Sequence, residues 1–268
     1  MQLFTHIKPF KAALLALAAS TSAIFSAQPG HSKVIELLLS IDVSGSVDSS
    51  EYDLVRQGYF NAFSDSGIRT NILSQTGFAI AVQQWDDSPY PVSIDWTDLT
   101  QGSNYDTFLT ALGGMSRVGS GATSPASAIT SGISLINGNA FSGDVKIIDV
   151  SGDGEENVQS FSSVSAARDN AFASGIIING LPINEGGTIV EDFYRDYVVT
   201  SNGSVFPAGS FADFNEAVKK KIEFESTGGG PQSSSVPAPL PVLGVAAALG
   251  SVRKLKKFSS QLKTYSMG

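Results

Sequence analysis

The feature that most restricts the possible folds is a nearly continuous apolar run over residues 34–41. A strand without polar alternation is typical of a parallel sheet that is buried on both faces. Asp48 or Ser49 can cap a helix directly afterwards, and apolar residues recur at helical spacing from Tyr52 to Phe63. The chain therefore begins its fold with a buried strand that leads into an amphipathic helix.

The rest of the central segment repeats this alternation. The sequence predicts strands over residues 77–85, 92–96, 145–150 and 176–179, and helices over residues 105–112, 125–136, 161–173 and 211–224. The strand at 92–96 could pair with the preceding strand as a hairpin. Such alternation predicts an α/β fold, a Rossmann-like three-layer α/β/α sandwich with a mostly parallel central sheet. Ligands of such sheets bind at the carboxyl ends of the strands.

Charge in the chain is concentrated in this central segment. All 25 acidic residues lie between Glu36 and Glu225, against nine of the 17 lysines and arginines. A surface this acidic repels a phosphate backbone, so we expect no nucleic-acid partner. A cation is correspondingly easier to hold.

Two terminal segments lie outside the expected domain, which we place at residues 34–226. Residues 1–27 combine Lys8 and Lys11 with an apolar stretch, which is typical of a secretory signal peptide; an N-terminal core helix is the alternative. Residues 227–239 are rich in Gly, Pro and Ser and are expected to form a linker. Residues 240–268 carry an apolar run followed by a basic cluster at 253–257. That run is about 20 Å long as a helix, too short for a comfortable membrane span.

The proline-containing, apolar and basic parts of this tail together resemble PEP-CTERM sorting signals of Gram-negative bacteria, in a variant common in cyanobacteria. The resemblance implies recognition by an exosortase-type protease, transient membrane contact, and a secreted or cell-surface location. Ala238 stands where that family usually has Glu. A weak membrane anchor or a disordered tail is the alternative.

A candidate metal-binding turn follows the first predicted strand. Asp42, Ser44 and Ser46 surround Gly45, which allows both hydroxyls to converge on one point. Carboxylate, hydroxyl and water oxygens are hard ligands suited to Mg²⁺ or Mn²⁺. A glycine-rich loop at 119–125 and the end of a later strand at 150–154 would project further oxygens onto the same edge.

At these positions the chain resembles the von Willebrand factor A domain, whose metal-ion-dependent adhesion site (MIDAS) combines Asp-x-Ser-x-Ser with a distant Thr and an Asp before Gly. The matching residues are Asp42, Ser44, Ser46, Thr123 and Asp153. Segments 149–154 and 175–182 resemble a bacterial branch of unknown function within that family. The resemblance implies Mg²⁺, or Mn²⁺ or Ca²⁺, touched directly by the three hydroxyls and often through water by the two aspartates. It also implies a protein partner whose Glu or Asp carboxylate completes the coordination.

Other polar and aromatic residues near these segments have simpler interpretations. We expect Asp149 to be a buried, hydrogen-bonded carboxylate, although it could begin a second metal turn. Acidic residues elsewhere are expected to form solvated surface, with a second cation site as the alternative: Glu155, Glu156, Asp86, Asp87, Asp95 and Asp98. Trp85, Trp96 and Tyr90 are expected to pack in the core or at the sheet edge instead of forming a ligand platform.

The residue types present argue against catalysis. The chain has no cysteine, and its two histidines, His6 and His31, lie in or beside the leader. A Ser-His-Asp triad or a histidine-ligated zinc is therefore excluded from the central domain. We predict an exported, divalent-cation-dependent binding or adhesion protein and no enzyme. The alternatives are a non-metal structural protein of the cell surface or matrix and a Mg-dependent phosphoryl hydrolase with Asp42 as nucleophile.

Overall fold

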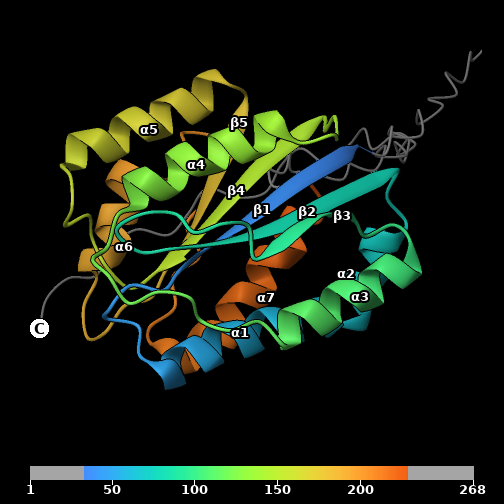
Figure 1. Ribbon diagram of the computed structural model, residues 1–268, viewed down its shortest axis with the longest axis horizontal. Helices are drawn as coiled ribbons and strands as arrows, with labels where there is room; N and C mark the ends of the chain where they lie inside the picture. The colour runs from blue at the N-terminus through green and yellow to red at the C-terminus, as the bar shows by residue number, and fades with distance from the viewer. Residues whose placement is uncertain (1–32, 229–268) are drawn as a thin grey trace, which may run out of the picture. The chain divides into compact units, whose positions relative to one another are not determined.

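The computed structural model describes residues 33–228, in which five strands form one sheet of order β3-β2-β1-β4-β5 (Figure 1). The parallel strands are β1 (Val34–Asp42), β2 (Gly77–Trp85), β4 (Val145–Gly152) and β5 (Ile176–Pro182). Strand β3 (Ile94–Asp98) pairs antiparallel with β2 at one edge. The expected signal peptide at 1–27, the sorting tail at 240–268 and nearly all of the linker at 227–239 lie outside the described residues.

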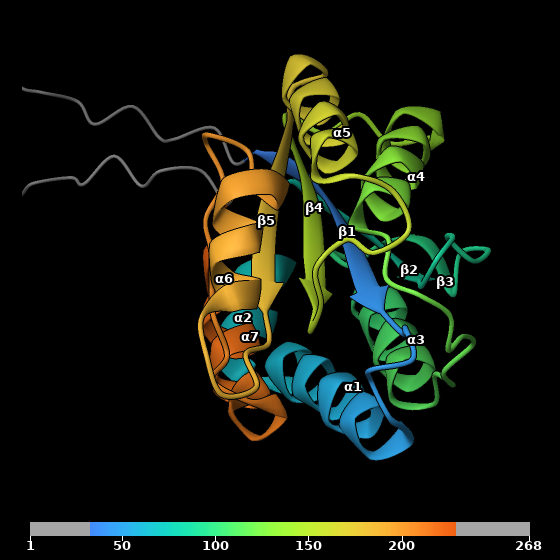
Figure 2. The same ribbon diagram turned by 90° about the vertical axis from the view of Figure 1, so that its left-hand side faces the viewer.

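Helices cover both faces of this sheet, as Figure 2 shows. One face carries α1 (Ser49–Ser64), α2 (Ser66–Leu73), α3 (Gly102–Gly113) and α7 (Phe214–Glu225). The other carries α4 (Pro125–Gly138), α5 (Phe161–Ala173), α6 (Ile189–Phe193) and the π-helical segment η1 (Tyr194–Val198). These layers confirm the predicted three-layer α/β/α sandwich.

Strand β1 lies at the centre of the sheet because its side chains are apolar on both faces. Leu37 and Leu39 pack with α1 and α7, whereas Leu38 packs on the opposite face with α4 and α5. All three side chains are fully buried. A central, doubly covered strand needs this nearly continuous apolar pattern, which only Glu36 and Ser40 interrupt. The carboxyl end of β1 is flanked by those of β2 and β4.

Most predicted elements are confirmed, with two omissions. Helix α2 was not predicted, nor were α6 and the η1 segment that follows it. Asp65 both ends α1 and caps α2, with its Oδ1 accepting from Gly67 and Ile68 N–H, so the chain turns sharply within a polar stretch. The last helix begins as a short 3-10 turn, η2 (Phe211–Asp213). Within the described part of the chain, no helix has both the length and the apolar content that a membrane crossing requires.

Candidate metal centre

The five predicted ligands lie at the carboxyl edge of the sheet. Asp42 is the last residue of β1, and Asp153 follows the last residue of β4. Because β1 and β4 are parallel neighbours, their ends and the turn carrying Ser44 and Ser46 meet at one place. Thr123 immediately precedes Ser124, the residue that caps α4.

Hydrogen bonds connect four of these residues. Ser44 N–H donates to Asp42 Oδ1 at 2.7 Å, and Ser44 Oγ lies 3.2 Å from Ser46 Oγ. Ser46 Oγ in turn donates to Asp153 Oδ1 at 2.8 Å. The structure therefore brings together two carboxylates and two hydroxyls from two strand ends.

Thr123 lies beside this group, held there by its main chain. Its N–H donates to Asn157 Oδ1 at 2.8 Å, and Asn157 N–H donates back to Thr123 O at 3.0 Å. A Cβ placed on Gly154 would lie 3.3 Å from Thr123 Oγ1, so this hydroxyl adjoins the residue after Asp153. Gly45 N–H also donates to Gly121 O at 2.8 Å, which fastens the metal turn to the glycine-rich loop.

Burial affects both carboxylates of the candidate site. Asp42 is 2% exposed, and its Oδ2 has no hydrogen-bond partner. Burial raises the pKa of Asp42 to about 7, opposed by the Ser44 N–H and increased by the nearby Asp153. Burial likewise raises the pKa of Asp153. A buried oxygen without a partner beside a second carboxylate is the arrangement that a bound cation satisfies, so the residues present fit a divalent metal.

Hydroxyl ligands are necessary for any such site. Among residues 33–228, no group of three or more His, Cys, Asp or Glu side chains could hold a metal ion. Two carboxylates supplemented by Ser44, Ser46 and Thr123 provide hard oxygen donors without a third acid, which is a set suited to Mg²⁺ or Mn²⁺.

Arg117 supports the metal turn and was not singled out from the sequence. Its Nη2 donates to the carbonyl oxygens of Val43 at 3.0 Å and Ser44 at 2.7 Å. The guanidinium thereby holds the turn through its backbone carbonyl groups and not through an acidic side chain. No sequence motif indicates this role, because its partners are backbone atoms far along the chain.

Asp86 also differs from its interpretation as surface charge. It is 2% exposed, and its Oδ2 accepts from Tyr90 OH at 2.7 Å, Gly121 N–H at 2.9 Å and Ser120 N–H at 3.2 Å. Burial alone would raise the pKa of Asp86, but these hydrogen bonds outweigh burial and leave the pKa lowered. Asp86 therefore shapes the loop that precedes Thr123. Asp87 and Asp95 are exposed as expected, and Asp98 is half-buried.

Glu156 was wrongly expected in a solvated rim. It is buried, and its Oε2 accepts from Ala126 N–H at 3.0 Å and Ser124 Oγ at 3.2 Å. Its Oε1 accepts from Val158 and Gln159 N–H at 3.1 and 2.9 Å. The Glu156 carboxylate satisfies one N–H group in the first turn of α4 and complements the helix dipole, which fixes the segment after Thr123. Glu155 is half-buried.

The remaining interpretations are confirmed. Asp149 is fully buried, accepts from Tyr59 OH at 3.1 Å and forms an ion pair with Lys221. Trp85 is fully buried, whereas Tyr90 and Trp96 are partly buried and pack against the core.

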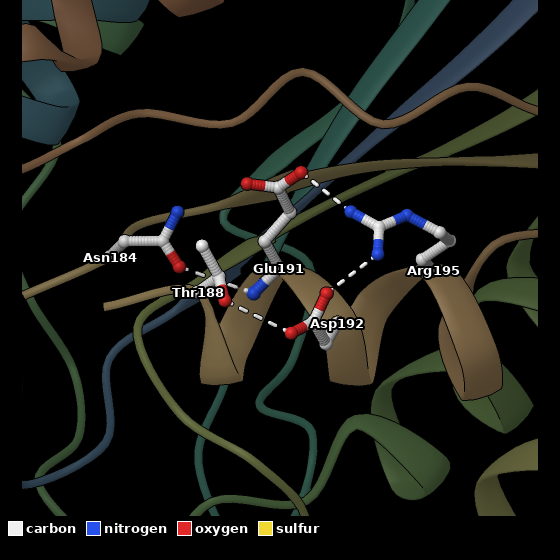
Figure 3. A network of polar contacts seen from close by, with 5 residues as sticks. All are labelled: Asn184, Thr188, Glu191, Asp192 and Arg195. Atoms are coloured by element: carbon white, nitrogen blue, oxygen red, sulfur yellow. Dashed lines mark hydrogen bonds and ion pairs between the residues drawn. The ribbon is translucent and has the colours of Figure 1, made fainter.

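A network of polar contacts fixes the segment that follows β5 (Figure 3). Arg195 binds Asp192 and Glu191, each at 2.6 Å, and Thr188 Oγ1 donates to Asp192 Oδ2 at 3.0 Å. Asn184 Oδ1 accepts from Glu191 N–H at 3.2 Å. Exposed pairs of this kind contribute little stability. Their role is to give the start of α6 a defined shape.

Solved structures with this fold include proximal thread matrix protein 1 from the mussel byssus, in its second crystal form. It is 13% identical, with a TM-score of 0.57 over 72% of this chain and 48% of that one. The same protein with a zinc-occupied MIDAS motif is 12% identical, with a TM-score of 0.52 over 71% and 46%. A von Willebrand factor type A protein from Catenulispora acidiphila is 13% identical, with a TM-score of 0.54 over 74% and 43%. This chain thus spans less than half the length of each.

The sequence itself matches no curated protein. Residues 33–229 match the family described as "Protein of unknown function (DUF1194)". That match covers the sheet, both helical layers and the five candidate ligands. The chain therefore belongs to the DUF1194 family, and its fold is that of the solved structures above, among them a von Willebrand factor type A protein.

Proposed function

We propose that this protein binds a divalent cation at the carboxyl edge of its sheet and uses it to capture an acidic group of a protein partner. The observation that carries the proposal is Asp42 Oδ2, a buried carboxylate oxygen without a hydrogen-bond partner, next to the Ser44–Ser46–Asp153 chain of oxygens. Ser44, Ser46 and Thr123 would hold the ion directly. Asp42 and Asp153 would supply negative charge, directly or through water.

Each residue has a distinct part in this arrangement. The bound cation would supply positive charge and a coordination position for a carboxylate of the partner. Asp42 is fixed by Ser44 N–H, and Ser46 bridges the turn to Asp153, so the ligands are held in place before the ion arrives. Mussel proximal thread matrix protein 1, with its zinc-occupied MIDAS motif, shows that this fold can hold a divalent ion at such a motif.

A binding role is favoured over phosphoryl transfer by the position of Asp42. A nucleophilic carboxylate must reach the phosphorus atom of a substrate, whereas Asp42 is 2% exposed and its Oδ1 accepts from Ser44 N–H. The two histidines lie outside the described residues, so within them no histidine serves as a general base. We therefore propose a non-enzymatic binding protein.

We further propose that the protein acts outside the cytoplasm, secreted or at the cell surface. The support is the sequence of residues 1–27, which is typical of a signal peptide, and the PEP-CTERM-like tail at 240–268. Mass spectrometry of the native protein tests this location. An intact N-terminus in the cytosolic fraction contradicts it.

Isothermal titration calorimetry of the full chain with Mg²⁺ and Mn²⁺ tests the metal site. We expect one ion per chain for the wild type and at least tenfold weaker binding for Asp42→Asn, which corresponds to about 1.4 kcal/mol. Asp95→Asn, at an exposed aspartate of β3, is the matched control and should bind like the wild type. Circular dichroism confirms that each variant is folded. Equal binding by folded Asp42→Asn and wild type would refute the site.

Partner capture needs a second measurement. Immobilised full chain is exposed to secreted material in Mg²⁺ buffer, with and without EDTA, and Asp42→Asn is run in parallel. We expect a protein that binds the wild-type chain in Mg²⁺ buffer to be missing both when EDTA is present and when Asp42→Asn replaces the wild type. A protein retained equally under all three conditions does not bind through this metal.

A further inference from the structure

Three charged side chains meet in the core between β4 and α7, away from the metal centre. Lys221 Nζ contacts Asp149 Oδ1 and lies 3.0 Å from Glu225 Oε1. All three side chains are 0% exposed. Charged residues are almost never buried completely unless they are paired, so three of them together in the core are unusual.

The charges in this cluster do not balance if every group is ionised. Two carboxylates face one ammonium, and the other neighbours, Tyr59 and Asn179, are neutral donors to Asp149 Oδ1 and Glu225 Oε1 at 3.1 and 2.9 Å. Burial, together with Asp149, raises the pKa of Glu225 to about 8 in spite of Lys221. Glu225 is therefore a carboxylic acid at neutral pH, and the cluster contains an amine, a carboxyl group and a proton donor in contact.

We propose that Lys221 and Asp149 condense to an intramolecular amide that joins α7 to β4. A proton passes from Lys221 to the Asp149 carboxylate, and the neutral amine attacks Asp149 Cγ. The new Nζ–Cγ bond forms while one Cγ–O bond breaks. Glu225 gives its proton to the departing hydroxyl and receives one from Nζ, so one water is released and Glu225 is regenerated. No oxidant or other reactant is consumed.

Geometry favours this condensation where solution chemistry would not. Groups held in contact react with effective molarities of about 10⁵–10⁸ M, which offsets the unfavourable equilibrium of amide formation in water. Tyr59 OH donates to Asp149 Oδ1 and polarises the carboxyl group. Once formed, the amide lies in a region from which solvent is excluded, so hydrolysis lacks its water.

Asp149 is the acyl partner and Glu225 the proton carrier, for two reasons. Of the two carboxylates, Asp149 lies closer to Nζ. Asn179 also holds Glu225 Oε1 by a hydrogen bond, which keeps that group at the side of the amine. The product would link residues far apart in a chain that has no cysteine and hence no disulfide.

Tryptic digestion of the full chain, followed by mass spectrometry, tests the proposal. An acylated Lys221 resists cleavage, so we expect peptide 147–168 joined to the peptide that begins at Lys221, with the summed mass reduced by one water. Fragmentation should place the link on Asp149. Separate linear peptides, or a water lost between Lys221 and Glu225 within one peptide, would overturn the proposal.

Variants assign the roles. Asp149→Asn should give the identical linked product, because ammonia leaves in place of water, whereas Lys221→Arg should give none. Glu225→Gln should leave most chains unlinked; full linking in this variant would overturn the role of Glu225. Asp169→Asn, at an exposed aspartate of α5, is the matched control and should link like the wild type.

Discussion

Replacing Gly152 by alanine tests how tightly the candidate metal centre is packed. A Cβ at this position would lie 2.6 Å from Asp42 Oδ2, 2.8 Å from Tyr194 OH and 2.9 Å from Asp42 Cβ. Neither neighbour moves freely, because Asp42 is held by Ser44 N–H and Tyr194 is fully buried. One methyl group forced into a packed site costs about 1–3 kcal/mol. For a domain of this size, 2 kcal/mol corresponds to a fall in Tm of about 6 °C.

Differential scanning calorimetry of the EDTA-treated full chain measures this effect without any contribution from metal. Gly138→Ala is the matched control, because a Cβ at this exposed last residue of α4 would meet nothing within 4 Å. Alanine favours a helix over glycine by about 1 kcal/mol, so this control should melt at or slightly above the wild-type temperature. Equal melting temperatures for Gly152→Ala and Gly138→Ala would refute the close packing of Asp42 and Tyr194 against Gly152.

Three further predictions concern buried carboxylates. In chains without the Lys221–Asp149 link, Glu225 has a pKa raised from 4.5 to about 8, so its contribution to stability is complete below pH 4.5 and is lost as pH rises through 8. Urea unfolding of the unlinked protein should show a decrease in the free energy of unfolding of about 5 kcal/mol at most, absent in Glu225→Gln. Glu156→Ala removes two hydrogen bonds at the start of α4 and two within its own loop, and should lower the free energy of unfolding by about 2–3 kcal/mol, whereas Glu155→Ala should change it little. Asp86→Asn places an amide against two N–H donors and should cost about 1–3 kcal/mol by the same assay and weaken Mg²⁺ binding, with Asp87→Asn as the control.

Local patterns were sufficient to predict the sheet and the edge at which the candidate ligands lie. Residues 34–41 are apolar at every position except Glu36 and Ser40, as a strand buried on both faces requires, and Asp42 follows at the end of that run. Helix α2 was missed because only Ile68 and Ile72 are buried in a short polar segment. The N-capping potential of Asp65 was the signal that could have identified it.

Supporting residues were harder to predict because their partners are distant backbone atoms. Glu156 and Asp86 resemble any surface carboxylate in the sequence, and only folding places loop N–H groups around them. Lys221 follows two other lysines, which suggests a solvated helix. Its helical phase was a usable signal, since Val218 and Glu225 lie one turn before and after it on the buried face of α7.

The position of Lys221 in the last helix has a consequence for how the chain folds. Helix α7 packs against α1, so the two ends of the folded segment meet only after everything between them has been made. If a nascent chain folded before α7 was made, it would bury Asp149 without Lys221 as its partner, which costs several kcal/mol. The domain also depends on parallel pairing of strands that are distant in the sequence, and such pairing forms slowly. We therefore expect the domain to remain unfolded during synthesis and to fold in one late step when α7 becomes available.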